Sequence, residues 1–309
     1  MGLTVLVSGA SGFVGSHLAR ALEDAGHDVR AMTRRPDEYD GAGIPVHGDV
    51  TDRDSLVDAL DGVDAAYYLV HSLDSADFEQ SDAEAARRFG EAAALAGVRQ
   101  LVYLGGLGAD GEDLSPHLRS RREVEALLGE HGVPVTAVRA AVVVGHGGIS
   151  WEMTRQLIAT LPMMLTPSWA STRTQPVALQ DVLRYLVGVL DHPDAIGATF
   201  EIGGSDVLTY EEMLRRASVI QTGRDVPVFE VPMLRNRLAT ALSTQVSAYW
   251  LALLTDVDVS TAKHLIESMD TEVVVTDRSI LDVVPGEPLG YDDMVREALA
   301  DRLREVGTL

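Results

Sequence analysis

The chain has 309 residues, of which 46% are hydrophobic and 23% charged, so it can build a large core and is not a disordered chain. No run approaches the ~20 apolar residues that a transmembrane helix needs, and we expect no signal peptide because no basic segment or cleavage site opens the chain. The absence of cysteine excludes disulfides, thiolate metal sites and cysteine nucleophiles. The nine histidines show no metal-binding spacing, so we predict no metal site.

The charge balance is strongly acidic. Lys and Arg total 25, Asp and Glu total 47, and the net charge is −22, with Lys263 as the only lysine. Such charge destabilises a compact state by self-repulsion unless salt screens it. We therefore predict a protein of a salt-rich cytoplasm. The alternative is an acidic protein from a GC-rich genome, in which codon bias replaces lysine by arginine. Nucleic-acid binding, which needs a basic face, is not expected.

Salt is accordingly expected to stabilise the protein. At about 1 M salt the Debye length falls to ~3 Å, so most of the repulsion between surface carboxylates is screened. We expect the melting temperature to rise substantially between low and molar KCl in a thermal scan. A melting temperature that stays flat across this range would contradict the salt-adapted interpretation.

The first half of the chain predicts a sheet covered on both faces. Short apolar runs without strict alternation, typical of buried parallel strands, alternate with helical patterns. Strands are expected at 3–7, 28–32, 45–48, 64–70, 100–104 and 135–139, and helices near 14–25, 53–60, 78–96 and 116–131. The alternation indicates an α/β fold with a doubly wound parallel sheet of the Rossmann type.

The pattern changes after about residue 145. We expect a helix from Ser150 as N-cap to 161, a loop over 162–176, a helix at 181–190, a helix that opens at Thr209 and a last helix at 291–306, with strands at 198–202, 226–231 and 272–276. We predict a dinucleotide-binding domain over 1–148 and a smaller, mostly helical substrate-side lobe over 149–309. No flexible linker separates the two, so the boundary is soft.

A glycine-rich turn follows the first strand. Gly9, Gly12 and Gly15 have the spacing G-x-x-G-x-x-G and open the first helix, and Ser11 adds a hydroxyl donor. Such glycines allow a tight turn, close approach of a pyrophosphate and close helix–strand packing. The helix N-terminus attracts phosphate. The alternative is a plain structural turn. We predict that a dinucleotide binds at Gly9, Ser11, Gly12, Phe13, Val14 and Gly15.

The end of the second strand favours NADP(H) over NAD(H). An NAD site usually places a carboxylate here to bind the ribose 2′-hydroxyl, but this strand continues into Thr33, Arg34 and Arg35. Two arginines suit a 2′-phosphate. Alternatively, they pair with the nearby Asp37 and Glu38.

The ends of the next two strands complete the predicted cofactor site. Asp49 and Val50 follow the third strand, where a carboxylate can accept a hydrogen bond from the adenine amino group, although Asp49 could instead cap a turn. Leu69, Val70 and His71 end the fourth strand and should run beside the ribose and nicotinamide.

These features resemble the atypical or extended branch of the short-chain dehydrogenase/reductase superfamily. The resemblance rests on the Gly9–Gly15 motif, on Gly-Asp-Val ending at Val50, on Leu-Val-Tyr ending at Tyr103 and on the segment from Gln175 to Val182. The chain is similar to NmrA-like NAD(P)H-binding proteins and to the NADPH-binding accessory subunit of respiratory complex I. The resemblance implies a nicotinamide cofactor and an oxidoreductase site.

The catalytic pattern departs from that superfamily, which usually has Ser after the fifth strand and Tyr-x-x-x-Lys on the next helix. Here Gly106 replaces the serine, and His117 and Arg121 take the tyrosine and lysine positions. Histidine can donate a proton near neutral pH, and arginine can bind ribose hydroxyls. Alternatively, Arg119 and Arg121 pair with Glu123 and Glu125, four residues further along the helix.

The substrate side is rich in large apolar residues, which would suit a lipophilic carbonyl, enone or quinone. They are Trp151, Met153, Met163, Met164, Trp169, Tyr249 and Trp250, each of which could equally be core. We predict an NADPH-dependent oxidoreductase acting on a small molecule, as a monomer or homodimer. The alternative is a non-catalytic NADP(H)-binding sensor or assembly protein. The missing Tyr-Lys pair argues against a nucleotide-sugar epimerase or dehydratase.

Overall fold

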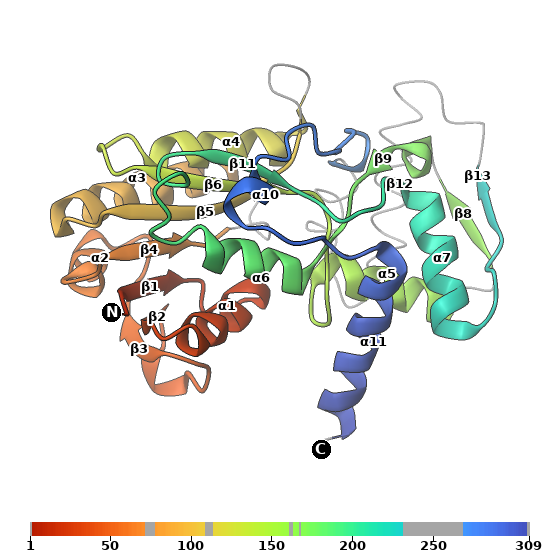
Figure 1. Cartoon of the computed structure of the whole chain (residues 1–309), viewed down its shortest axis with the longest axis horizontal. Helices are drawn as coiled ribbons and strands as arrows, with labels where there is room; N and C mark the ends of the chain where they lie inside the picture. Colours follow the sequence, from red (N-terminus) through yellow and green to blue (C-terminus); the bar gives the residue numbers. More distant parts are fainter. Residues whose placement is uncertain are drawn as a thin grey trace.

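A computed structural model describes residues 2–71, 78–108, 114–160, 163–166, 168–230 and 268–307. Seven parallel strands form one sheet in the order β11-β6-β5-β4-β1-β2-β3 (Figure 1). They are β1 (Thr4–Ser8), β2 (Asp28–Thr33), β3 (Ile44–His47), β4 (Ala65–Tyr68), β5 (Gln100–Gly106), β6 (Val135–Ala140) and β11 (Thr199–Ile202). Successive strands are added outward on both sides of β1, so the order reverses between β1 and β4. In such sheets ligands bind at this switch point, outside the carboxyl ends of the strands.

Helices cover both faces of the sheet. α1 (Phe13–Asp24) and α6 (Leu179–Gly188) pack on one face, and α2 (Arg53–Leu60), α3 (Phe78–Ala96) and α4 (Pro116–Leu128) on the other (Figure 1). Within β1, Val5 and Val7 join the first core and Leu6 joins the second. Both faces of the strand are therefore apolar, which explains its run of hydrophobic residues and confirms the predicted doubly wound fold.

A smaller, mostly helical lobe lies beyond the carboxyl ends of the strands (Figure 1). α5 (Ile149–Thr160), α7 (Tyr210–Thr222) and α11 (Tyr291–Gly307) share a core around the buried side chains of Trp151 and Tyr291 (Figure 1). The other short elements are β7 (Val143–Val144) paired with β10 (Val177–Ala178), β9 (Arg173–Thr174) with β12 (Leu208–Thr209), β8 (Met164–Thr166) with β13 (Val228–Glu230), η1 (Pro36–Glu38), η2 (Ser168–Ser171) and α10 (Ile280–Val283). The chain beyond residue 148 thus forms the lobe and also supplies β11 to the sheet and α6 to one of its faces.

Three local expectations are wrong. Ser150 is not an N-cap, because α5 begins at Ile149, and the Glu152 side chain instead accepts the N–H of Gly147 at 3.2 Å. The expected loop 162–176 contains β8, η2 and β9, whose strand partners lie far away in the sequence. The expected strand at 272–276 forms one isolated bridge, between Thr174 and Val273. By contrast, Thr209 caps α7 as predicted, in a reciprocal capping box with Glu212.

The buried side chain of Gln100 ties the sheet to the chain that follows α6. Its Nε2 donates to Thr136 Oγ1 at 2.8 Å and to the Val189 carbonyl at 3.1 Å, and its Oε1 accepts the N–H of Asp191 at 2.8 Å. Asp191 has a φ of 54°, which is unfavourable for a residue with a side chain. The glutamine therefore holds a strained turn in place.

Replacing Gln100 by leucine is expected to destabilise the protein. Gln100 is 2% exposed, so the change leaves buried polar groups without partners, at about 1–3 kcal/mol each. We expect urea denaturation to show a loss of about 2–5 kcal/mol in the free energy of unfolding. The exposed Gln80, on the surface of α3, provides the matched control, for which a change within about 0.5 kcal/mol is expected. Equal effects at both positions would contradict the role of this network.

Candidate cofactor and active site

The turn between β1 and α1 is shaped by its three glycines. Gly9 has a φ of 69°, and the N–H of Gly12 donates to the Gly9 carbonyl at 2.9 Å. A Cβ on Gly15 would lie 2.1 Å from the Gly9 oxygen, so a side chain cannot be accommodated there. No side chain caps α1, and its first turn has no acidic residue. The N-terminal end of α1 therefore remains suited to an anion, and the turn fits the pyrophosphate of a dinucleotide.

A cavity of about 610 Å³ opens beside this turn, at the carboxyl ends of β1, β4, β5 and β6. This size is typical of a small-molecule site. Its lining brings together nine of the residues predicted from the sequence, namely Gly9, Gly12, Phe13, Val14, Gly15, Leu69, His71, His117 and Arg121. The other predicted residues do not line it, namely Ser11, Thr33, Arg34, Arg35, Asp49, Val50 and Val70.

The predicted residues that do not line the cavity follow β1, β2, β3 or β4, at the same edge of the sheet as the cavity. Arg35 Nη1 forms an ion pair with Glu38 Oε2 at 2.8 Å, with both side chains largely exposed. The alternative pairing is thus present for Arg35. Arg34 is exposed and, within the described chain, has no carboxylate at ion-pair distance. Arg34 is therefore the better placed of the two to meet an added phosphate.

Asp49 caps a turn through its Oδ1 atom, which leaves Oδ2 available to a ligand. Its Oδ1 accepts both the N–H of Thr51 at 2.8 Å and the Thr51 hydroxyl at 2.7 Å. The Thr51 N–H is the largest influence that lowers the pKa of Asp49, and the charge of Arg34 lowers it further. The carboxylate is therefore ionised at neutral pH. Both of these hydrogen bonds go to Oδ1, so Oδ2 remains compatible with an adenine amino group.

A second glycine-rich turn, residues 145–148, packs on the first. A Cβ on Gly148 would lie 2.7 Å from Phe13 Cε1, and one on Gly145 would lie 3.1 Å from Phe13 Cζ. His146 fixes the turn, because its Nδ1 is 3.0 Å from Glu152 Oε1 and its Nε2 hydrogen-bonds to Glu305 of α11. The glycines of the second turn therefore allow it to approach Phe13 closely, where the sheet meets the helical lobe.

The end of β5 explains the missing serine. A Cβ on Gly106 would lie 2.7 Å from Leu118 Cδ2 and 3.6 Å from Arg121 Cγ, because α4 approaches the strand closely. A serine at this position therefore requires repacking of Leu118. α4 itself begins where expected, with Ser115 as N-cap and Pro116 in its first turn.

The arginines of α4 pair differently from the alternative prediction. Arg119 Nη2 lies 3.6 Å from Glu79 of α3, and Arg122 Nη1 lies 3.8 Å from Glu125. Within the described chain no carboxylate lies within ion-pair distance of Arg121. Desolvation and the positive charge of Arg121 both lower the pKa of His71, whose side chain keeps contact with solvent. The cavity thus holds a permanent cation beside an imidazole whose protonated form is disfavoured.

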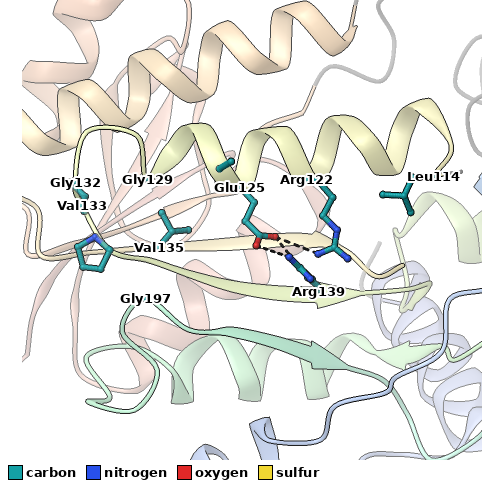
Figure 2. Close-up of a pocket in the computed structure, with 11 residues that line it drawn as sticks. Leu114, Arg122, Glu125, Gly129, Gly132, Val133, Val135, Arg139 and Gly197 are labelled. Atoms are coloured by element: carbon teal, nitrogen blue, oxygen red, sulfur yellow. Dashed lines mark hydrogen bonds and ion pairs between the residues drawn. The ribbon is translucent and has the colours of Figure 1, made fainter. Parts of the chain in front are cut away.

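A second hollow, of about 760 Å³, lies between α4 and β6 (Figure 2). There Glu125 lies between two arginines, with its Oε1 2.8 Å from Arg139 Nη2 and its Oε2 3.8 Å from Arg122 Nη1. Its described lining shares no residue with the cavity beside the glycine turn. One carboxylate thus pairs with two arginines here, and because the two linings are separate, this hollow is not part of the candidate cofactor site.

The substrate side of the cavity is formed by residues that local sequence patterns did not indicate. Tyr210, Met269 and Val273 line it. Burial raises the pKa of Tyr210 to about 12. Trp151, by contrast, is 1% exposed and belongs to the core of the lobe, and Tyr249 and Trp250 lie outside the described residues.

Two further features of the described residues concern metals and membranes. No group of three or more histidine, aspartate or glutamate side chains is arranged to hold a metal ion. No helix among them is both long enough and apolar enough to cross a bilayer.

Comparisons with known proteins agree with this geometry. A family model described as NAD(P)H-binding matches residues 9–193. The chain is 31% identical to the (4-alkanoyl-5-oxo-2,5-dihydrofuran-3-yl)methyl phosphate reductase of Streptomyces griseus subsp. griseus, over 69% of this chain and 72% of that protein. It is 26% identical to the mitochondrial NADH dehydrogenase (ubiquinone) 1 alpha subcomplex subunit 9 of Arabidopsis thaliana, over 69% of this chain and 56% of that protein.

Solved structures share the fold. The triphenylmethane reductase of Citrobacter sp., complexed with NADP(H), matches with a TM-score of 0.73 and 18% identity, over 96% of this chain and 99% of that one. An NADPH-dependent quinone oxidoreductase of Escherichia coli matches with a TM-score of 0.73 and 17% identity, again over 96% and 99%. The chain therefore belongs to the NAD(P)H-binding family of atypical short-chain dehydrogenases/reductases.

Proposed function

We propose that the protein is an NADPH-dependent oxidoreductase that reduces a lipophilic carbonyl, enone or quinone-type compound. One observation carries the proposal: the glycine cradle opens directly into a cavity that continues to Tyr210, Met269 and Val273, where a small molecule would lie beside the reactive end of a dinucleotide. The names of the reductases to which the chain is similar support this class of reaction.

The cofactor would lie along the carboxyl ends of the strands. The turn from Gly9 to Gly15, with the Ser11 hydroxyl, would hold the pyrophosphate. The 2′-phosphate would meet Thr33, Arg34 and Arg35. The adenine would lie near Asp49 and Val50, and the ribose and nicotinamide near Leu69, Val70 and His71. When bound, a reduced nicotinamide supplies a hydride. His117 and Arg121 would act on the substrate or the ribose.

We extend the proposal to the organisation of the chain. Residues 1–148 would bind the nucleotide, and residues 149–309, including Tyr210 and Met269, would close the substrate side of the cavity. The charge of −22 suits a salt-rich cytoplasm. The proposed substrate is a small molecule, taken up by a monomer or a homodimer.

A second candidate is a protein that binds NADP(H) without turnover, as a sensor or assembly factor. The observation in its favour is Gly106, because Leu118 occupies the space that a catalytic serine needs. The similarity to a subunit of NADH dehydrogenase points the same way.

One experiment separates the two candidates. The nucleotide that copurifies would be identified, and oxidation of NADPH would be followed with panels of aldehydes, ketones, enones and quinones at molar KCl. We expect NADP(H) to copurify and at least one acceptor to oxidise NADPH, with the Gly12→Asp variant as the inactive control. Tight NADPH binding without oxidation by any acceptor would favour the non-catalytic candidate.

A further inference from the structure

Arg121 is an unusual residue for this chain. The described lining of the cavity contains no aspartate or glutamate, and Arg121 alone in it carries a permanent positive charge. Acidic residues outnumber basic ones by 47 to 25, and the neighbouring Arg119 and Arg122 both pair with carboxylates. Figure 2 shows how Glu125 compensates Arg122 one residue away. The charge of Arg121 also acts on Tyr103, as does that of the buried Asp82, but no carboxylate of the described chain forms an ion pair with Arg121. A cation beside a largely apolar cavity is costly unless an anion compensates it, so we expect an anionic ligand to pair with Arg121.

The position of Arg121 separates it from the phosphates. Its stem lies beside Gly106 at the end of β5, and its charge acts on His71, just beyond β4. The glycine turn follows β1, and Arg34 follows β2. In the sheet order β5-β4-β1-β2, Arg121 and Arg34 therefore lie on opposite sides of the pyrophosphate cradle. Arg121 lines the cavity on its β5–β4 side, where the nicotinamide and its substrate would lie under the proposed function.

An arginine limits the chemistry that this position can perform. A guanidinium keeps its protons at any physiological pH, so it stabilises negative charge but is not a proton donor. Reduction of an isolated ketone creates a strongly basic alkoxide, which needs an acid beside it as it forms. Two histidines line the cavity. His71 has a lowered pKa and is a poor source of that proton, so reduction of an isolated ketone would depend on His117 alone.

Reduction of a conjugated acceptor depends less on an acid beside the substrate. An enone takes up the hydride at its β-carbon, the electron pair of the C=C bond shifts toward the carbonyl carbon, and the carbonyl π pair moves onto the oxygen. The resulting enolate is a weak base that a fixed cation stabilises. One proton from solvent then adds at the α-carbon, or at oxygen in a quinone. The acceptor gains two electrons and two hydrogens, and the nicotinamide is oxidised.

We propose that Arg121 is a catalytic residue that stabilises the developing oxyanion of a conjugated carbonyl acceptor, so that the site reduces enones or quinones in preference to isolated ketones. This inference rests on the proposed reductase function and narrows its substrate class.

The first test compares two substrates with the same carbon skeleton, benzylideneacetone as the enone and benzylacetone as the isolated ketone. We expect NADPH oxidation with the enone only. Arg121→Gln should lower kcat/KM for the enone by about 100- to 1,000-fold, the effect of losing one oxyanion donor. Arg121→Lys should restore part of it, and the Arg119→Gln control should change little. Equal reduction of both substrates, or an active Arg121→Gln variant, would overturn the inference.

The second test does not depend on turnover. para-Nitrophenol, whose phenolate mimics an enolate, would be titrated by its absorbance in wild type, Arg121→Gln and Arg119→Gln, each with oxidised cofactor bound. We expect wild type and Arg119→Gln, but not Arg121→Gln, to favour the bound phenolate and lower the pKa of the phenol. Equal phenolate binding in wild type and Arg121→Gln would overturn the inference. A loss of NADPH affinity in Arg121→Gln, in place of a loss of phenolate binding, would overturn it as well. If no acceptor oxidises NADPH, the proposed function fails, and phenolate binding still decides whether Arg121 holds an oxyanion.

Discussion

A Gly12→Asp variant is expected to lose nucleotide binding while its fold stays intact. Gly12 is the N-cap of α1, with φ −82° and ψ 171°, a conformation that aspartate adopts readily. Aspartate is a favourable N-cap, since its side chain accepts the N–H groups of the first turn. Those N–H groups are the ones that a pyrophosphate would need. The new carboxylate would therefore satisfy the helix and repel the ligand from the same place.

Both halves of this expectation can be measured. We expect the affinity for NADPH in calorimetric titration to fall at least about 100-fold, which corresponds to about 2.7 kcal/mol. The free energy of unfolding should stay within about 1 kcal/mol, since the cap offsets the tight contact of a Cβ with the Gly9 carbonyl, at 3.2 Å. Gly12→Ala isolates the steric part, and Gly307→Asp adds the same charge in open space. Undiminished affinity in Gly12→Asp would remove the basis of the proposed cofactor site.

Removal of Arg34 is expected to weaken NADP(H) far more than NAD(H). The two cofactors differ by one 2′-phosphate, and a charge-assisted hydrogen bond contributes roughly 1.5–3 kcal/mol. The dissociation constant for NADP(H) should therefore rise about 10- to 100-fold in Arg34→Ala. Arg35→Ala should have a smaller effect, because Arg35 already pairs with Glu38. The double variant should approach equal affinity for the two nucleotides.

The measurement is a titration of both nucleotides at one fixed salt concentration. Arg20→Ala, which removes an exposed arginine from the side of α1, controls for the change in net charge. Equal losses for NADP(H) and NAD(H), or a wild type that prefers NAD(H), would show that the end of β2 does not select the cofactor.

The sequence alone determined the features that depend on short stretches of chain. The turn from Gly9 to Gly15 could be predicted because Gly12 and Gly15 act on the backbone at Gly9, within seven residues, although Gly9 itself also lies against the distant Leu69. The N-caps Ser115 and Thr209 marked the starts of α4 and α7, since a cap bonds only the next turn. The runs of β1 to β6 predicted a sheet covered on both faces, because their composition records burial on each side.

Only the tertiary structure decided how distant residues meet. Whether Arg34 or Arg35 is compensated depends on the fold of η1, where Glu38 reaches one arginine and not the other. The contact that a serine at Gly106 would make with Leu118 arises because α4 is brought against β5 across a long connection. The ribbons β8–β13 and β9–β12 and the cavity residues Tyr210 and Met269 arise from contacts that no local pattern encodes. The same holds for Arg121. Which charges surround its side chain depends on the elements packed around α4, and the residues next to it in the sequence do not show this.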